Sequence, residues 1–156
     1  SDVCSSDLFG MKICYPGPRR KDDVPHPYYS DLEALARDAD CLAVTCALTP
    51  ATRHLVDARI LQALGPEGFL VNVARGAVVD ENALVAALAN HQLGGAALDV
   101  FRDEPHVPPA LFTMDNVVLA PHMGTGTREV REGRAEMFLH DVRAHFAGLG
   151  LKYVVA

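Results

Sequence analysis

The chain has 156 residues, 49% of them hydrophobic, which is enough to bury the core of one domain. Its formal net charge of −6 at pH 7 argues against a general role in binding nucleic acids or anionic membranes, because both attract cations. No apolar run approaches the ~20 residues of a membrane-spanning helix, and the first residues lack the pattern of a secretion signal.

Strand-like and helix-like segments alternate along the chain. Five short apolar runs, each stopped by proline, glycine or polar residues, predict strands over residues 11–15, 41–46, 68–73, 96–100 and 116–120. The run at 41–46 is apolar nearly throughout, as expected of a parallel strand that is covered on both faces.

Helix signals lie between these runs. Residues 30–33 have the S-x-x-E form of a capping box. Further helices are expected over residues 57–64 and 81–89, the latter with Asp80 as its N-cap, and a long charged helix over 125–146. The apolar stripe of the long helix consists of Val130, Met137, Phe138 and Val142.

This alternation predicts an α/β fold, namely a doubly wound parallel sheet of the Rossmann type. The chain contains no internal repeat and no low-complexity linker. The five strands are therefore expected to share one sheet in one domain.

Three of the expected strands are followed at once by polar side chains. Arg75 follows the strand in Val-Asn-Val-Ala-Arg-Gly, Glu104 lies in an Asp-Glu-Pro turn, and His122 lies in Ala-Pro-His-Met-Gly. Ligands of open α/β sheets bind beyond the carboxyl ends of the strands. An arginine, a carboxylate and a histidine at that edge suit chemistry on a small carbonyl acid.

Each residue has a definite chemical capability. Arg75 can bind a substrate carboxylate through two hydrogen bonds, and His122 can supply or remove a hydroxyl proton. Glu104 can hold the tautomer of an imidazole and favour its protonated form. Taken singly, the three also fit a surface ion pair, a solvated turn and a loop residue; their joint occurrence at successive strand ends favours catalysis.

Three ordered segments, residues 71–88, 94–105 and 116–124, resemble the D-isomer-specific 2-hydroxyacid dehydrogenases, and among them the glyoxylate/hydroxypyruvate reductases. The resemblance implies a catalytic set of Arg75, Glu104 and His122. It implies that the enzyme transfers a hydride between NAD(P)H and a small 2-keto or 2-hydroxy acid, and that the full-length protein is a homodimer.

The resemblance also implies where a dinucleotide is bound. Asp99, in the Leu-Asp-Val-Phe motif, is similar to the residue that binds the nicotinamide carboxamide. The other implied cofactor contacts are Cys46, Ala47, Leu48, Thr52, Val73, His122 and Gly124.

The strand at residues 11–15 bears on which cofactor is used. NAD-selective sheets usually end the corresponding strand with an acidic residue, which binds the ribose 2′-hydroxyl. Here the stretch from Tyr15 to Lys21 contains Arg19, Arg20 and Lys21 and no acid. These cations favour NADP(H) over NAD(H), because they can bind a 2′-phosphate; the alternative is a solvated basic loop.

The first residues do not fit such a domain. A glycine-rich phosphate loop would lie about twenty residues ahead of this strand, whereas only ten residues precede Met11. The sheet is thus expected to lack its first strand and that loop. Residues 1–8 match the in-frame translation of a common sequencing-library adapter, so we expect a non-native leader. The rival hypothesis is a natural short paralogue. A genomic sequence that encodes Ser1 to Leu8 would support the paralogue and contradict the adapter origin.

The expected organisation follows. Residues 9–124 would form part of a dinucleotide-binding domain, and residues 125–156 a helix and tail that return to a substrate domain. The chain alone is expected to be inactive. The alternative function is a non-catalytic dinucleotide-binding or partner-scaffold module, which would not need Arg75, Glu104 and His122 together. An unrelated flavodoxin-like domain is disfavoured by the same three motifs.

Cysteines and histidines indicate neither disulfides nor a metal. The four cysteines, Cys4, Cys14, Cys41 and Cys46, form no C-x-x-C pair, and buried reduced thiols in a cytoplasmic protein are expected. The seven histidines include no H-E-x-x-H motif, so no metal site is predicted.

Overall fold

The computed structural model describes residues 10–154, so the leader expected over residues 1–8 lies outside the described residues. The chain divides after Leu119 into two compact units. No helix among the described residues is both long and apolar enough to cross a membrane.

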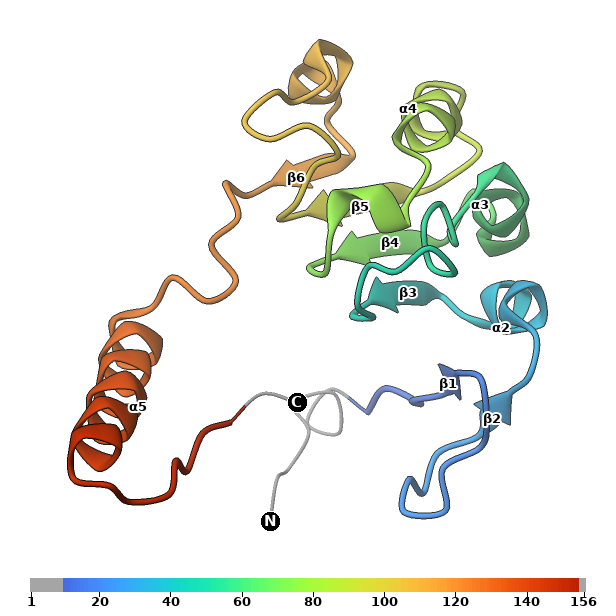
Figure 1. Ribbon diagram of the computed structural model, residues 1–156. Helices are drawn as coiled ribbons and strands as arrows, with labels where there is room; N and C mark the ends of the chain where they lie inside the picture. The colour runs from blue at the N-terminus through green and yellow to red at the C-terminus, as the bar shows by residue number, and fades with distance from the viewer. Residues whose placement is uncertain (1–9, 155–156) are drawn as a thin grey trace. The chain divides into compact units, whose positions relative to one another are not determined.

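A four-stranded sheet forms the centre of the first unit. Its strands are β3 (Cys41–Val44), β4 (Phe69–Asn72), β5 (Gly95–Leu98) and β6 (Val117–Leu119). They lie side by side in chain order, and every neighbouring pair is parallel (Figure 1). Val44, Asn72 and Leu98 share one register across the sheet. The parallel α/β sheet predicted from the sequence is confirmed.

Helical segments connect the strands. They are α2 (Leu32–Asp38), α3 (Ala58–Leu64), the 3₁₀ turn η1 (Gly76–Val78), α4 (Glu81–Ala89) and the 3₁₀ turn η2 (Pro109–Thr113). Asp57 and Asp80 cap α3 and α4 by accepting two backbone N–H groups each, as expected of N-cap aspartates. The N-cap of α2 is Asp31 rather than Ser30 of the expected capping box, because the Asp31 carboxylate accepts from the Glu33 amide.

Over residues 10–119, within the first unit, only one face of the sheet is covered. Leu42, Leu70 and Leu98 are buried in the core with residues of α2, α3 and α4. On the opposite face Phe69 is 53% exposed and Val118 is 67% exposed. The expectation that the strand at 41–46 is covered on both faces is therefore wrong here; its side chains alternate between buried and exposed.

The strand expected over residues 11–15 is not part of this sheet. Its place is taken by β1 (Tyr15–Pro16), which pairs in parallel with β2 (Tyr28–Tyr29) in a separate two-stranded sheet. Proline donates no backbone hydrogen bond to a strand ladder, so the strand stays short. The sequence predicted five strands in one sheet; four of them form that sheet, and the first does not join it.

The second unit contains one long helix, α5 (Arg128–Phe146), capped by Thr127. The following tail folds back onto the helix, since Asp141 accepts hydrogen bonds from the backbone amides of Lys152 and Tyr153. The expected apolar stripe is not buried: Met137 is 43% and Phe138 69% exposed.

The three described cysteines are free, but the expected burial is wrong. Cys14 and Cys46 are half-buried and Cys41 is exposed, because it lies on the open face of the sheet. Partial burial of the sulfur atoms raises the pKa of the Cys14 and Cys41 thiols. The negative charge of Asp38 raises the pKa of Cys14 further, and that of Asp40 does the same for Cys41. Over residues 10–154, no cluster of three or more histidine, cysteine or acidic side chains is placed to hold a metal ion.

Candidate active site

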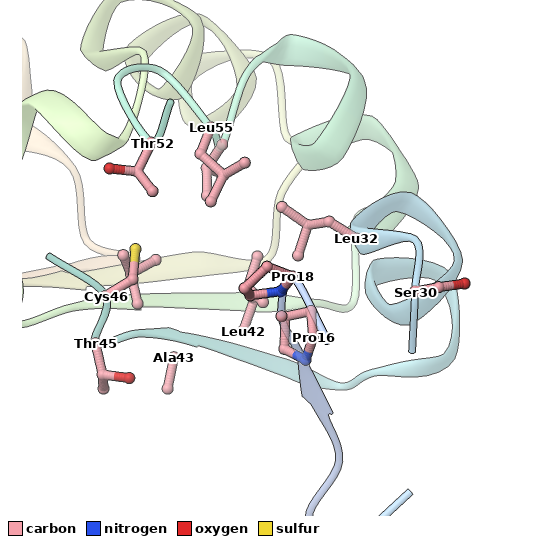
Figure 2. A pocket seen from close by; sticks show the side chains of 13 residues that line it. Pro16, Pro18, Ser30, Leu32, Leu42, Ala43, Thr45, Cys46, Thr52 and Leu55 are labelled. Atoms are coloured by element: carbon pink, nitrogen blue, oxygen red, sulfur yellow. The ribbon is translucent and has the colours of Figure 1, made fainter. Parts of the chain in front are cut away.

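A cavity of about 400 Å³ opens along β3 and the loop that follows it. Its lining comes from residues 16–18, from Ser30 and Leu32, from residues 42–46, and from Thr52, Leu55 and Val56. Figure 2 shows Thr52 and Leu55 on one side of the cavity, with Cys46 and Pro18 across from them. A largely apolar cavity at the carboxyl end of a parallel strand is suited to a flat ring of a bound nucleotide.

A threonine hydroxyl fixes the loop that follows β3. Thr52 Oγ1 donates to the Ala47 carbonyl over 2.7 Å and accepts from the Thr49 backbone amide over 2.7 Å. Thr52 and Cys46 both line the cavity, whereas Leu48 is 41% exposed. The cofactor-binding residues predicted from Cys46 to Thr52 therefore lie in one short, internally hydrogen-bonded loop.

The predicted basic loop borders the same cavity. Pro16, Gly17 and Pro18 line it, and Arg19 and Arg20 follow directly with exposed side chains. Within the described ranges neither arginine forms an ion pair with a carboxylate.

A buried asparagine shapes the turn that presents Arg75. Asn72 is 1% exposed; its Oδ1 accepts from the Ala74 amide over 3.1 Å, and its Nδ2 donates to the Arg75 carbonyl over 3.2 Å. The Arg75 side chain is exposed and donates to the Ala74 carbonyl. Sequence reasoning missed Asn72, although a single amide within an apolar strand is a usable signal.

The turn that carries Arg75 is packed against the turn that carries Glu104. Gly76 is so close to the peptide between Phe101 and Arg102 that a side-chain carbon at this position would overlap its backbone atoms. Glu104 Oε1 in turn accepts from the Phe101 amide over 3.0 Å. Arg75 and Glu104 thus come from two turns in direct backbone contact.

A second carboxylate holds the same peptide segment. Glu81, at the start of α4, is 8% exposed, and its Oε1 accepts from the Arg102 amide over 3.0 Å. Glu81 Oε2 also lies 4.0 Å from Arg102 Nε. Sequence reasoning missed this residue, because a glutamate in the first turn of a helix is usually solvated.

Two further predicted residues lie at neighbouring strand ends. Asp99 is 7% exposed, and its backbone amide donates to the Asn72 carbonyl over 3.0 Å. Val73 is 50% exposed, and its amide donates to the Val44 carbonyl over 3.4 Å. Both therefore lie at the carboxyl edge of the sheet, as the sequence predicts.

The remaining predicted residues, His122 and Gly124, belong to the second unit. His122 is exposed and has a backbone φ of 54°, in the left-handed region that residues with a side chain rarely adopt. Such a conformation costs about 1–3 kcal/mol and is concentrated at functional sites. His54 and His91 have the same kind of backbone conformation, so the role of His122 stays a prediction.

Comparison with known proteins defines the class of this chain. Residues 5–124 match the NAD binding domain of the D-isomer specific 2-hydroxyacid dehydrogenases. That match covers the whole four-stranded sheet and the turns that carry Arg75, Glu104 and His122. The chain belongs to this family.

Individual relatives of this chain are glyoxylate or glyoxylate/hydroxypyruvate reductases by name. A glyoxylate/hydroxypyruvate reductase of Arabidopsis thaliana is 47% identical over 146 residues, 94% of this chain and 47% of that protein. A glyoxylate reductase of Thermococcus litoralis is 41% identical and covers 90% of this chain. The crystal structure of an NADPH-dependent glyoxylate/hydroxypyruvate reductase from Sinorhizobium meliloti, in complex with NADP and malonate, superposes with a TM-score of 0.87 at 38% identity, over 91% of this chain and 44% of that one. The chain spans about half the length of the curated relatives it matches.

Proposed function

We propose that this chain is the dinucleotide-binding part of a longer reductase, which converts a small 2-keto acid such as glyoxylate or hydroxypyruvate to the 2-hydroxy acid with NADPH. The observation that carries the proposal is the packing of the Arg75 turn on the Glu104 turn through Gly76. It supports a site in which Arg75 binds the substrate and the nearby Glu104 carboxylate orients the histidine that donates a proton. Residues 9–124 would form the dinucleotide-binding domain, and residues 125–156 would return to a substrate domain.

The described residues fit a nicotinamide dinucleotide. The apolar cavity along β3 has room for a nucleotide ring and is bordered by the loop that Thr52 fixes. Arg19 and Arg20, next to it, carry charge suited to a 2′-phosphate. These cations, and the NADPH dependence stated for the Sinorhizobium meliloti protein, support NADP(H) over NAD(H).

Each catalytic residue has one task in the proposed reaction. A bound dinucleotide supplies the hydride for the carbonyl carbon. Arg75, exposed at the end of its turn, binds the substrate carboxylate and polarises the adjacent carbonyl. His122 donates a proton to the forming alkoxide, and Glu104 keeps the imidazole oriented and protonated. Such acid–base assistance contributes about 10²–10⁴-fold in rate.

Steady-state kinetics of the full-length protein test this assignment. With NADPH and glyoxylate, His122→Gln is expected to lower kcat by about 10²–10⁴-fold, since the proton donor is lost. Arg75→Lys is expected to raise KM for the keto acid about 10-fold or more, since lysine cannot bind a carboxylate in bidentate fashion. Matched controls are His145→Gln and Arg59→Lys; both side chains are exposed, Arg59 to 70%.

The alternative has a distinct outcome in the same experiment. A full-length protein that binds NADPH but reduces neither glyoxylate nor hydroxypyruvate would contradict the reductase assignment and support a non-catalytic dinucleotide-binding module. We further propose that the full-length protein is a cytoplasmic homodimer, and sedimentation equilibrium of the purified protein would measure its mass.

A further inference from the structure

Two tyrosine hydroxyls anchor the two ends of the basic loop, residues 17–21. The Tyr28 hydroxyl donates to the Gly17 carbonyl over 2.8 Å. The Tyr15 hydroxyl accepts from the Lys21 amide over 2.9 Å and contacts the Lys21 carbonyl at 3.3 Å. One side chain therefore holds the start of the loop and the other holds its end.

The two tyrosines form a single support. Tyr15 and Tyr28 are partners in the parallel pairing of β1 with β2, and their ring centroids lie 5.5 Å apart. Pro16 and Pro18 have no backbone N–H, so neither residue can donate a strand-type hydrogen bond. The two tyrosine hydroxyls provide hydrogen bonds to the loop backbone instead.

The loop lies where a charged ligand group would meet the cavity. Pro16, Gly17 and Pro18 form part of the cavity wall, and Figure 2 shows Pro16 and Pro18 beside Leu42. Arg19 and Arg20 follow with exposed side chains and, across residues 10–154, without an ion pair to any carboxylate. A group with two negative charges can therefore bind there without displacing a protein carboxylate.

We infer that Tyr15 and Tyr28 determine cofactor specificity by holding the Arg19–Lys21 segment in the shape that binds the ribose 2′-phosphate of NADPH. This inference rests on the NADPH preference in the proposed function. Both tyrosines are positioning residues, since they act through the loop. A loop that is ordered before binding loses less conformational entropy when it binds the phosphate. NADH has no 2′-phosphate, so the contact that this ordering prepares is absent when NADH binds.

Removing each hydroxyl alone tests the inference in the full-length protein. Tyr15→Phe and Tyr28→Phe keep the rings and the β1–β2 contact, and each removes the anchor at one end of the loop. Each variant is expected to bind NADPH about 3–10-fold more weakly, the range of one net hydrogen bond, with NADH affinity unchanged. The dissociation constants of both dinucleotides would be measured by titration calorimetry.

Tyr29→Phe is the matched control. Tyr29 is the neighbouring residue of β2, but its hydroxyl donates to Asp38 Oδ2 over 2.8 Å instead of to the loop. Loss of the Tyr29 hydroxyl is expected to leave the ratio of the dissociation constants for NADPH and NADH unchanged.

The outcomes separate this inference from the proposal on which it rests. A wild-type protein that binds NADH as tightly as NADPH would overturn the NADPH preference itself. A wild-type protein that prefers NADPH, with the same preference in both tyrosine variants, would overturn only the inference. Equal loss of affinity for both dinucleotides in the variants would also overturn it, because that result indicates a general structural role.

Discussion

The side chain of Asn72 lies beneath the turn that presents Arg75, and it satisfies one backbone donor and one backbone acceptor of that turn. Arg75 itself is exposed and is the residue that sequence reasoning selects. Asn72 thus positions the residue that is proposed to bind the substrate carboxylate, without any need to touch the substrate itself.

Replacing Asn72 tests this arrangement. Asn72→Leu is expected to destabilise the protein by about 1–3 kcal/mol, because the buried Ala74 N–H loses its partner and the Arg75 carbonyl keeps only the Val78 amide. Urea denaturation of the full-length protein followed by circular dichroism measures the change. Asn82→Leu, at an exposed position of α4, should change the stability by no more than about 0.5 kcal/mol. Equal effects of the two substitutions would contradict the role given to Asn72.

Sequence reasoning identified the residues with chemistry of their own but not those that act through the fold. Arg75 and Glu104 could be selected because each lies a few residues beyond an apolar run that predicts a strand. Glu81 could not, because its carboxylate binds the Arg102 amide, 21 positions further along the chain. No local pattern reports such a contact.

At the scale of elements, Gly76 joins two turns that carry predicted catalytic residues. It is the first residue of η1, and it packs directly on the backbone of Phe101 and Arg102 after β5. The close approach leaves no space for a side chain. The relative position of Arg75 and Glu104 therefore depends on a glycine at this point.

Gly76→Ala is expected to separate the two turns. The new methyl group would overlap backbone atoms, which cannot swing aside as a side chain could, so the full-length enzyme should lose at least about 2 kcal/mol of stability and most of its kcat/KM. Gly133→Ala is the control: the position lies inside α5 with open space around it, and alanine there should stabilise by about 0.5–1 kcal/mol. Unchanged kcat/KM in Gly76→Ala would contradict the packing argument.

The elements themselves divide into those that local signals determine and those that depend on partners. The helix α4 begins after Asp80 and ends at Ala89 as predicted, because an N-cap aspartate and a run of helix formers are local features. The strand expected over residues 11–15 was predicted wrongly, because no local pattern shows that Tyr15 pairs with Tyr28 instead of joining the main sheet. An apolar run such as residues 41–46 also cannot report which of its faces will be covered.

At the scale of the whole molecule, each unit exposes apolar side chains. Phe69, Val73 and Val118 lie on strands or strand ends of the first unit and are at least half exposed. Phe138 is 69% exposed on α5 in the second unit. Exposed apolar surface of this kind marks contact sites. Together with a length about half that of the matched relatives, it supports the proposal that the chain functions within a longer protein.

The most direct test of the proposed function compares two proteins in one assay: the full-length protein that contains residues 9–156, and the 156-residue chain alone. NADPH oxidation would be followed by absorbance with glyoxylate or hydroxypyruvate, and repeated with NADH. We expect turnover by the full-length protein, faster with NADPH than with NADH, and none from the chain alone. A full-length protein that binds NADPH without turning over either keto acid would contradict the proposed function.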